Sequence, residues 1–195
     1  MDPLSQGIVG SVAAQQKSSK EKILLITIIG FLSGMAPDLD VFIRSSHDPL
    51  LAIEFHRQFT HSLIFIPFGG FICGTFFYHV LTKRKGMSIK ETYLYCTLAY
   101  ASHGILDACT SYGTQLFWPF NDFRVAWNTI SIVDPIFTIT LFTLVFLSIF
   151  RRKTIFARIA LIWVITYMSI GLIQHNRAEK VGLLNADSRG HIPAR

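Results

Sequence analysis

The chain has 195 residues, of which 51% are hydrophobic and only 15% are charged. Soluble domains carry about 25% charged residues, so this composition argues against a water-soluble globular enzyme and excludes a disordered chain. Lys and Arg (18) outnumber Asp and Glu (12), which leaves a net charge of +6. Together with a mean hydropathy of +0.43, these features are typical of a membrane protein.

Apolar stretches divide the chain into candidate helices. The first, residues 4–16, consists mainly of small residues and is too short to span a bilayer, so we expect a helix packed inside a bundle or re-entrant. A spanning helix needs about 20 apolar residues. Five longer runs reach or approach that length, the first and third of them being shorter and ending in acids: 23–37, 62–81, 92–108, 133–150 and 155–174.

Three basic clusters set the expected orientation of these runs. They lie at residues 17–22, 83–90 and 151–158. If the runs are spans, all three clusters fall on one face, which the positive-inside rule makes cytoplasmic. The segments 38–60 and 109–131 and both termini then share the opposite, periplasmic face.

Acids and histidines gather where the apolar runs meet this outer face, in four groups. In the first, Pro37 disfavours helix at the residue before it, and in the extended stretch expected to follow, Asp38 and Asp40 point to the same side. The second group is the segment HRQFTHS at 56–62. Here Thr60 is expected to cap the next helix and to place His61 in its first turn.

The third group pairs His103 with Asp107, which lie four residues apart on one face of a helix and can therefore ligate one ion. The fourth is Asp134 before Pro135, for which a plain helix cap is the simpler interpretation. Any single group has such a structural explanation. Four such groups at the same level of the membrane favour a functional site, because acids and histidines are energetically costly in membrane segments. Their carboxylates and imidazoles are ligands that suit zinc, manganese or iron.

The residues in these groups receive predicted roles. Arg57, between two histidines, can grip a phosphate or carboxylate as a bidentate donor, or it can serve as a counter-charge for nearby acids. We interpret His79 as structural, and Tyr112, Trp118 and Trp127 as an interfacial aromatic belt. The predicted metal ligands are Asp38, Asp40, His56, His61, His103 and Asp107, and the predicted catalytic residues are Arg57 and Asp134.

Several motifs occur in the order seen in the YdjM-like family of bacterial inner-membrane, metal-dependent hydrolases, which the chain resembles from residue 1 to about 175. HRxFTHS and SHxxLD in this order are specific, whereas PDLD alone is weak. The motifs are MDPLSQG (1–7), APDLD (36–40), HRQFTHS (56–62), SHGILD (102–107), TSYGT (110–114), WPF (118–120) and IVDP (132–135).

The resemblance implies a helical bundle with a divalent-metal site, zinc being the first expectation. The family is similar in pattern to zinc-dependent phospholipase C and S1/P1-type nucleases, which hold zinc with an early Asp, a His and an HxxxD pair. Carried over to this chain, the early Asp is Asp38 or Asp40, the His is His56 or His61, and the pair is His103 and Asp107.

Two departures from the family pattern stand out. Many members have a His near the start, where Gln6 stands here, which bears on any second or third ion. Many also continue into a further outer domain, whereas this sequence ends at Arg195, so we expect a shortened member or a fragment. The predicted domains are a membrane-embedded, hydrolase-like unit at 1–176 and a polar tail at 177–195.

The predicted fold class is all-α: a polytopic membrane bundle of about five to six helices with a polar metal site at its outer face. The predicted function is hydrolysis of an ester or phosphoester, a lipid being compatible, by a metal-activated water. The alternatives are a metal-ion or proton transporter and a non-catalytic scaffold with a closed metal shell. We expect the bacterial inner membrane as location, the lipid bilayer as partner, and no nucleic acid.

Overall fold

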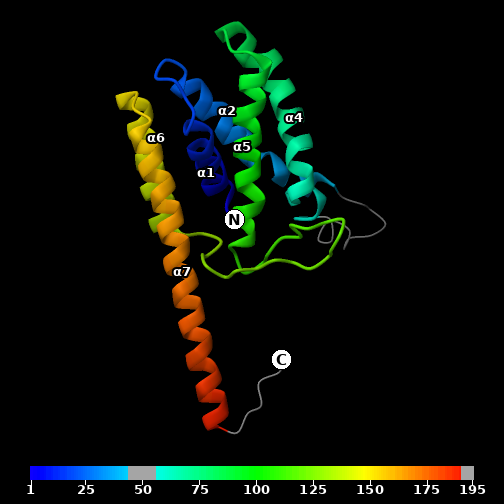
Figure 1. Cartoon of the computed structure of the whole chain (residues 1–195), viewed down its shortest axis with the longest axis vertical. Helices are drawn as coiled ribbons and strands as arrows, with labels where there is room; N and C mark the ends of the chain where they lie inside the picture. Colours follow the sequence, from blue (N-terminus) through cyan, green and yellow to red (C-terminus); the bar gives the residue numbers. More distant parts are fainter. Residues whose placement is uncertain (44–55, 190–195) are drawn as a thin grey trace.

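The structure is a computed structural model that describes residues 1–43 and 56–189 (Figure 1). Six α-helices, joined in part by short 3-10 and π-helical segments, make up the described chain, which confirms the predicted all-α bundle. The helices are α1 (Pro3–Gln15), α2 (Ile23–Met35), α4 (Ile66–Phe77), α5 (Ile89–Ala108), α6 (Pro135–Arg151) and α7 (Ile155–Ser188).

Helix α1 is the packed inner helix of the bundle, as its small residues predict. Asp2 caps it by accepting a hydrogen bond from the Ser5 amide, and ten of its thirteen residues are buried. It packs against α2 and α5. A Cβ on Gly34 of α2 would lie 2.8 Å from the Gln6 carbonyl oxygen, and one on Gly10 would lie 2.6 Å from that of Gly30. Small residues therefore let the two backbones touch, as in other membrane helix pairs.

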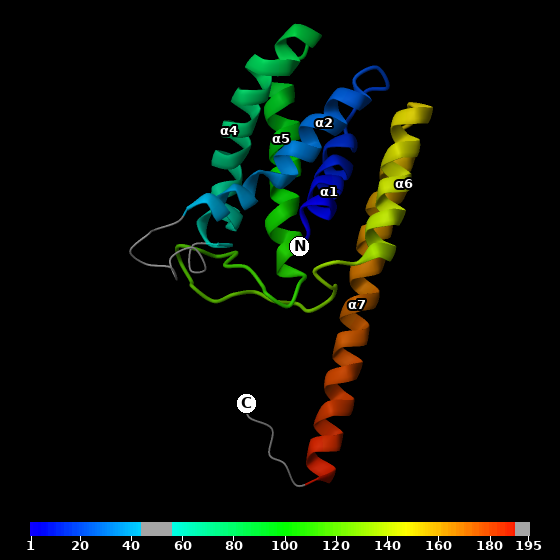
Figure 2. The same ribbon diagram turned by 180° about the vertical axis from the view of Figure 1, so that it is seen from behind.

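Helix α5 lies between α1, α2 and α4 and carries His103 and Asp107 in its last turns. A capping box formed by Ser88 and Glu91 starts it. On the other flank, α6 and α7 form a pair (Figures 1 and 2). Helix α7 does not stop near residue 174 as predicted: it continues to Ser188 and projects beyond the rest of the bundle. Residues 190–195 of the predicted tail lie outside the described residues.

Three helical stretches are long and apolar enough to cross a membrane: Ile23–Phe42, Leu63–Lys85 and Ile155–Ser188. These match three of the five predicted spans. Helix α6 is apolar but has only 17 residues. Helix α5 has 20 residues but is more polar, because the helices around it, rather than lipid, cover much of its surface.

The ends of the bundle separate the basic clusters from the acids and histidines. The turns that join α1 to α2, α4 to α5 and α6 to α7 lie at one end, while the loop after α5 and the N-terminus lie at the other (Figures 1 and 2). The three basic clusters predicted from sequence therefore share one end.

Two local predictions were wrong. Asp38 and Asp40 lie in a 3-10 helix, Ala36–Phe42, rather than in an extended stretch. Thr60 is not a helix cap: it lies in a short 3-10 turn, and α4 starts only at Ile66, with Phe65 at the cap position. The side chain of Thr60 turns instead to Asp40.

Candidate metal centre

The structure brings all six predicted ligands to the same end of the bundle, in two overlapping groups. In each group the prospective ligand atoms lie within 4.8 Å of one another. Asp38 belongs to both groups and is the most exposed member of the first. The first group is Asp38, His61, His103 and Asp107, and the second is Asp38, Asp40 and His56.

The first group has the spacing of a tetrahedral ligand shell. The Nε2 atoms of His61 and His103 lie 3.0 Å apart. Asp38 Oδ1 lies 3.4 and 3.3 Å from these two nitrogens, and Asp107 Oδ2 lies 3.3 and 3.5 Å from them. Zinc bonds to nitrogen and oxygen of about 2.0–2.1 Å give tetrahedral edges of about 3.3 Å, so the four atoms fit around one ion.

Hydrogen bonds orient both imidazoles toward this point. Nδ1 of His103 lies 2.5 Å from the Gly34 carbonyl oxygen, which can only accept, so Nδ1 carries the proton. Thr60 Oγ1 donates to Asp40 and lies 2.9 Å from Nδ1 of His61, so this nitrogen also donates. Both Nε2 atoms thus keep their lone pairs for a metal, the arrangement that outer hydrogen bonds usually impose on ligand histidines.

The electrostatics of the cluster also favour a cation. Three carboxylates (Asp38, Asp40, Asp107) face two positive groups (Arg57 and the Met1 amine), which leaves −3 + 2 = −1 with neutral imidazoles. Asp107 Oδ2 is buried without a hydrogen-bond partner, although Arg57 Nε lies 3.2 Å away. Burial alone would lower the pKa of His61, but hydrogen bonds to the surrounding carboxylates raise it to about 10. The cluster therefore attracts either a proton or a metal ion.

Helix α1 and the residue at the start of the chain supply two partners for Asp107 that the sequence alone did not predict. The Met1 amine and Gln6 Nε2 both donate to Asp107 Oδ1, the latter over 2.8 Å. Gln6 and Asp107 are fully buried. The MDPLSQG motif drew attention to Gln6 in the sequence, but it did not indicate that Gln6 contacts Asp107.

Asp40 and His56 lie beside the first group rather than inside it. Asp40 Oδ1 lies 2.8 Å from His56 Nδ1, and Oδ2 accepts from the Arg57 amide (3.1 Å) and from Thr60 (2.8 Å). With both oxygens engaged, Asp40 fixes the segment that carries His61. Its role as a ligand, like that of His56, stays a prediction.

Arg57 is almost fully buried and has a left-handed backbone conformation (φ 63°). Its guanidinium pairs with Asp107, donates to Thr110 Oγ1 over 3.2 Å and lies 4.8 Å from the centre of the Tyr112 ring. The Tyr112 ring also lies 5.2 Å from Arg124, so Tyr112 contacts two arginines at the site, and its place in an interfacial belt stays a prediction. The TSYGT motif was the signal that pointed to Thr110 and Tyr112.

Asp134 has the plain structural role that its position before Pro135 suggested. Its carboxylate caps α6 by accepting from the Phe137 amide, and it also accepts from the Tyr167 hydroxyl. Among the described residues, neither ligand group includes Asp134. Its predicted catalytic role stays a prediction.

Comparison with known proteins agrees with this architecture. The family described as "YdjM inner membrane protein" matches residues 1–178. The chain belongs to the YdjM inner membrane protein family. This family assignment confirms the resemblance carried by the motifs, and it covers every residue of the candidate metal centre.

A curated relative of this YdjM-family chain is "Inner membrane protein YbcI" of Escherichia coli (strain K12). It is 25% identical over 154 residues, which cover 76% of this chain and 82% of the relative. No solved structure matches the chain. The chain is thus an inner membrane protein with apolar helices and a His/Asp cluster that can hold a metal ion.

Proposed function

We propose that this protein is a membrane-bound, metal-dependent hydrolase that acts on an ester or phosphoester. The observation that carries the proposal is the convergence of four nitrogen and oxygen donors at tetrahedral spacing, beside a buried arginine. Such donors suit zinc, with manganese or iron as further candidates. A bound divalent ion would polarise the substrate and lower the pKa of a coordinated water towards about 7.

Different residues of the chain would bind the metal ion and the substrate. His61, His103 and Asp107 are buried and rigidly held, so they would fix the ion. Asp38 is partly exposed and lines the adjacent cavity, so substrate would approach from its side. Arg57 lines the same cavity and would bind an anionic group of the substrate.

The position of the cluster favours hydrolysis over transport. All candidate ligands lie near one end of the bundle, where α2 and α5 end, rather than in a line across it. A scaffold with a purely structural metal would need all four donors of the first group bound at once, which closes the shell. A hydrolase would need one position open to water, and the three buried donors His61, His103 and Asp107 would leave that position on the side of the partly exposed Asp38.

Metal analysis joined to a substrate panel tests the proposal. We expect about one divalent ion per detergent-purified chain, together with hydrolysis of a phosphodiester, phosphomonoester or carboxylic ester that a chelator abolishes and added zinc restores. A full metal content with no turnover on any of the three substrate classes would favour the scaffold instead.

The proposed orientation places the site in the periplasm and the basic turns in the cytoplasm. In a variant whose three native cysteines, all buried, are replaced by alanine, Asn121→Cys should react with an impermeant maleimide in intact cells. Lys85→Cys should react only after lysis. Both positions are exposed, so the comparison is matched. Labelling of position 85 from outside would overturn the orientation.

The substitution Arg57→Lys tests the role of the guanidinium. Lysine keeps the charge but loses the planar fork, so we expect the metal and the fold to be retained. Turnover of an anionic substrate should fall by about 100-fold, the scale for loss of one well-placed donor. A neutral ester should be affected less. Equal losses on both substrates, or loss of metal, would instead make Arg57 a structural counter-charge for Asp107.

A further inference from the structure

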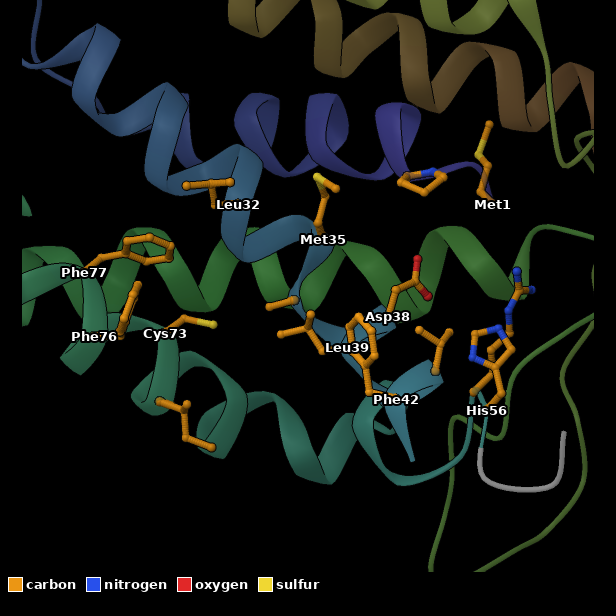
Figure 3. Close-up of a pocket in the computed structure, with 15 residues that line it drawn as sticks. Met1, Leu32, Met35, Asp38, Leu39, Phe42, His56, Cys73, Phe76 and Phe77 are labelled. Atoms are coloured by element: carbon orange, nitrogen blue, oxygen red, sulfur yellow. The ribbon is translucent and has the colours of Figure 1, made fainter. Parts of the chain in front are cut away.

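A cavity of about 810 Å³ adjoins the metal centre and runs between α2 and α4 (Figure 3). Its size lies within the usual range of ligand pockets, about 300–1,000 Å³. Asp38 and His56 lie toward one end, while Phe76 and Phe77 lie at the other (Figure 3). The cavity therefore connects the polar cluster to an apolar surface between α2 and α4.

The lining of this cavity changes character along its length. Asp38, His56 and Arg57 are the polar members, and they belong to the metal centre or touch it. The other twelve of its fifteen lining residues are apolar. Such a lining suits a ligand with one charged end and a long apolar remainder.

Ten of the twelve apolar lining residues belong to two helical stretches that can cross the membrane, Ile23–Phe42 and Leu63–Lys85. Four large side chains of these walls are substantially exposed: Leu32 (42%), Phe42 (75%), Ile72 (60%) and Phe76 (58%). In a bilayer their surroundings are lipid. The groove is thus open to the hydrocarbon layer and not only to water.

The apolar end of the groove lies near the middle of a stretch that can cross the membrane. Its lining residues on α4 run from Ile72 to Phe77, and these residues surround the midpoint of the stretch Leu63–Lys85. The hydrocarbon core of a bilayer is about 30 Å thick, so one leaflet contributes about 15 Å. A ligand with its head at the cluster, where this stretch begins, would therefore have its tail near the bilayer midplane.

We propose that the substrate is a bilayer lipid whose anionic phosphoester head lies at the metal centre and whose hydrocarbon tail occupies this groove. This inference rests on the proposed hydrolase function and specifies its substrate class. The charge fits, because the cluster carries −1 and becomes +1 with a divalent ion. A small water-soluble phosphoester would leave the apolar groove unfilled.

Binding can be tested without turnover. The probe is a lysophosphatidic acid with a diazirine near the end of its acyl chain, photolysed on the full-length protein in detergent. We expect cross-links on α2 and α4 around Leu32 and Phe76, suppressed by excess unlabelled lysophosphatidic acid but not by glycerol phosphate. Cross-links confined to α6 and α7, or unaffected by the competitor, would overturn the proposal.

A matched pair of variants on adjacent positions sharpens the test. Ile72→Trp places a larger side chain in the groove, whereas Phe71→Trp changes an equally exposed position that lines a different cavity, beside Ile89 and Tyr93. Ile72→Trp should reduce competed cross-linking by about tenfold or more, which corresponds to losing roughly two buried methylenes. Phe71→Trp should leave it unchanged. Equal effects of the two variants would contradict a tail in the groove.

Turnover separates this inference from the hydrolase function itself. With long-chain substrate, Ile72→Trp should lower kcat/KM by about tenfold, while a short-chain phosphoester should be hydrolysed at the wild-type rate. If kcat/KM depends neither on the chain length of the substrate nor on this substitution, the groove does not bind the tail, although the hydrolase function would stand. If the lipid probe cross-links in the groove but no substrate is hydrolysed, the lipid-binding site would stand and the proposed hydrolase function would be wrong.

Discussion

Replacing His103 with alanine is expected to yield protein without bound metal. His103 is fully buried, its Nδ1 is fixed by the Gly34 carbonyl, and its Nε2 lies among the other three donors. Loss of an orienting partner typically costs about 10–100-fold in metal affinity, so loss of a ligand itself should cost more than about 100-fold. Metal content of the purified protein and titration with zinc would measure this.

Two further substitutions, with smaller expected effects on metal affinity, extend the same experiment. Asp40→Asn should lose about 10–100-fold in affinity, since Asp40 orients His61 through Thr60 rather than completing the four-donor group. His79→Ala should leave metal content unchanged, because His79 lies in the π-helical turn Tyr78–Thr82, where its ring packs against Tyr78. A full metal complement in the His103 variant would show that the proposed centre is wrong.

The substitution Gly104→Ala should weaken metal binding by about 100-fold without touching any ligand. A Cβ at this position would overlap the backbone carbonyl oxygen of His61, so the His61 segment would have to move away from α5. Disturbing the orientation of a ligand typically costs about 10–100-fold in metal affinity, and displacement of the whole His61 segment is expected at the upper end of that range. Zinc titration of the variant against the wild type would measure the loss.

Gly182→Ala provides the matched control. Both glycines are helical, and alanine favours a helix over glycine by about 1 kcal/mol in each case. A Cβ at Gly182 meets nothing within 4 Å, so this variant should bind metal normally and melt at the same or a slightly higher temperature. If Gly104→Ala also binds metal like the wild type, the close contact between α5 and the His61 segment does not position the ligand.

The membrane class, the helical fold and the gathering of acids and histidines at one end of the bundle follow from the sequence alone, because they depend on local properties. Apolar run length, the position of basic clusters and the Asp134-Pro135 cap are all encoded within a few residues. For the same reason the pairing of His103 with Asp107 on one helix face could be predicted. The motifs also indicated which polar residues to consider together, although not how they meet.

Only the tertiary structure showed which of these polar residues surround the candidate metal position and which contact them from outside. The distance between His61 and His103, 42 residues apart, depends on the close approach of the His61 backbone to α5 at Gly104. The packing of α1 against α5 brings Gln6 to Asp107, and the segments that precede α4 and follow α5 bring Arg57 onto Tyr112. The apolar groove arises between α2 and α4, which are separate in sequence. Such contacts are non-local and depend on how whole helices fit, so residue type and spacing alone could not specify them.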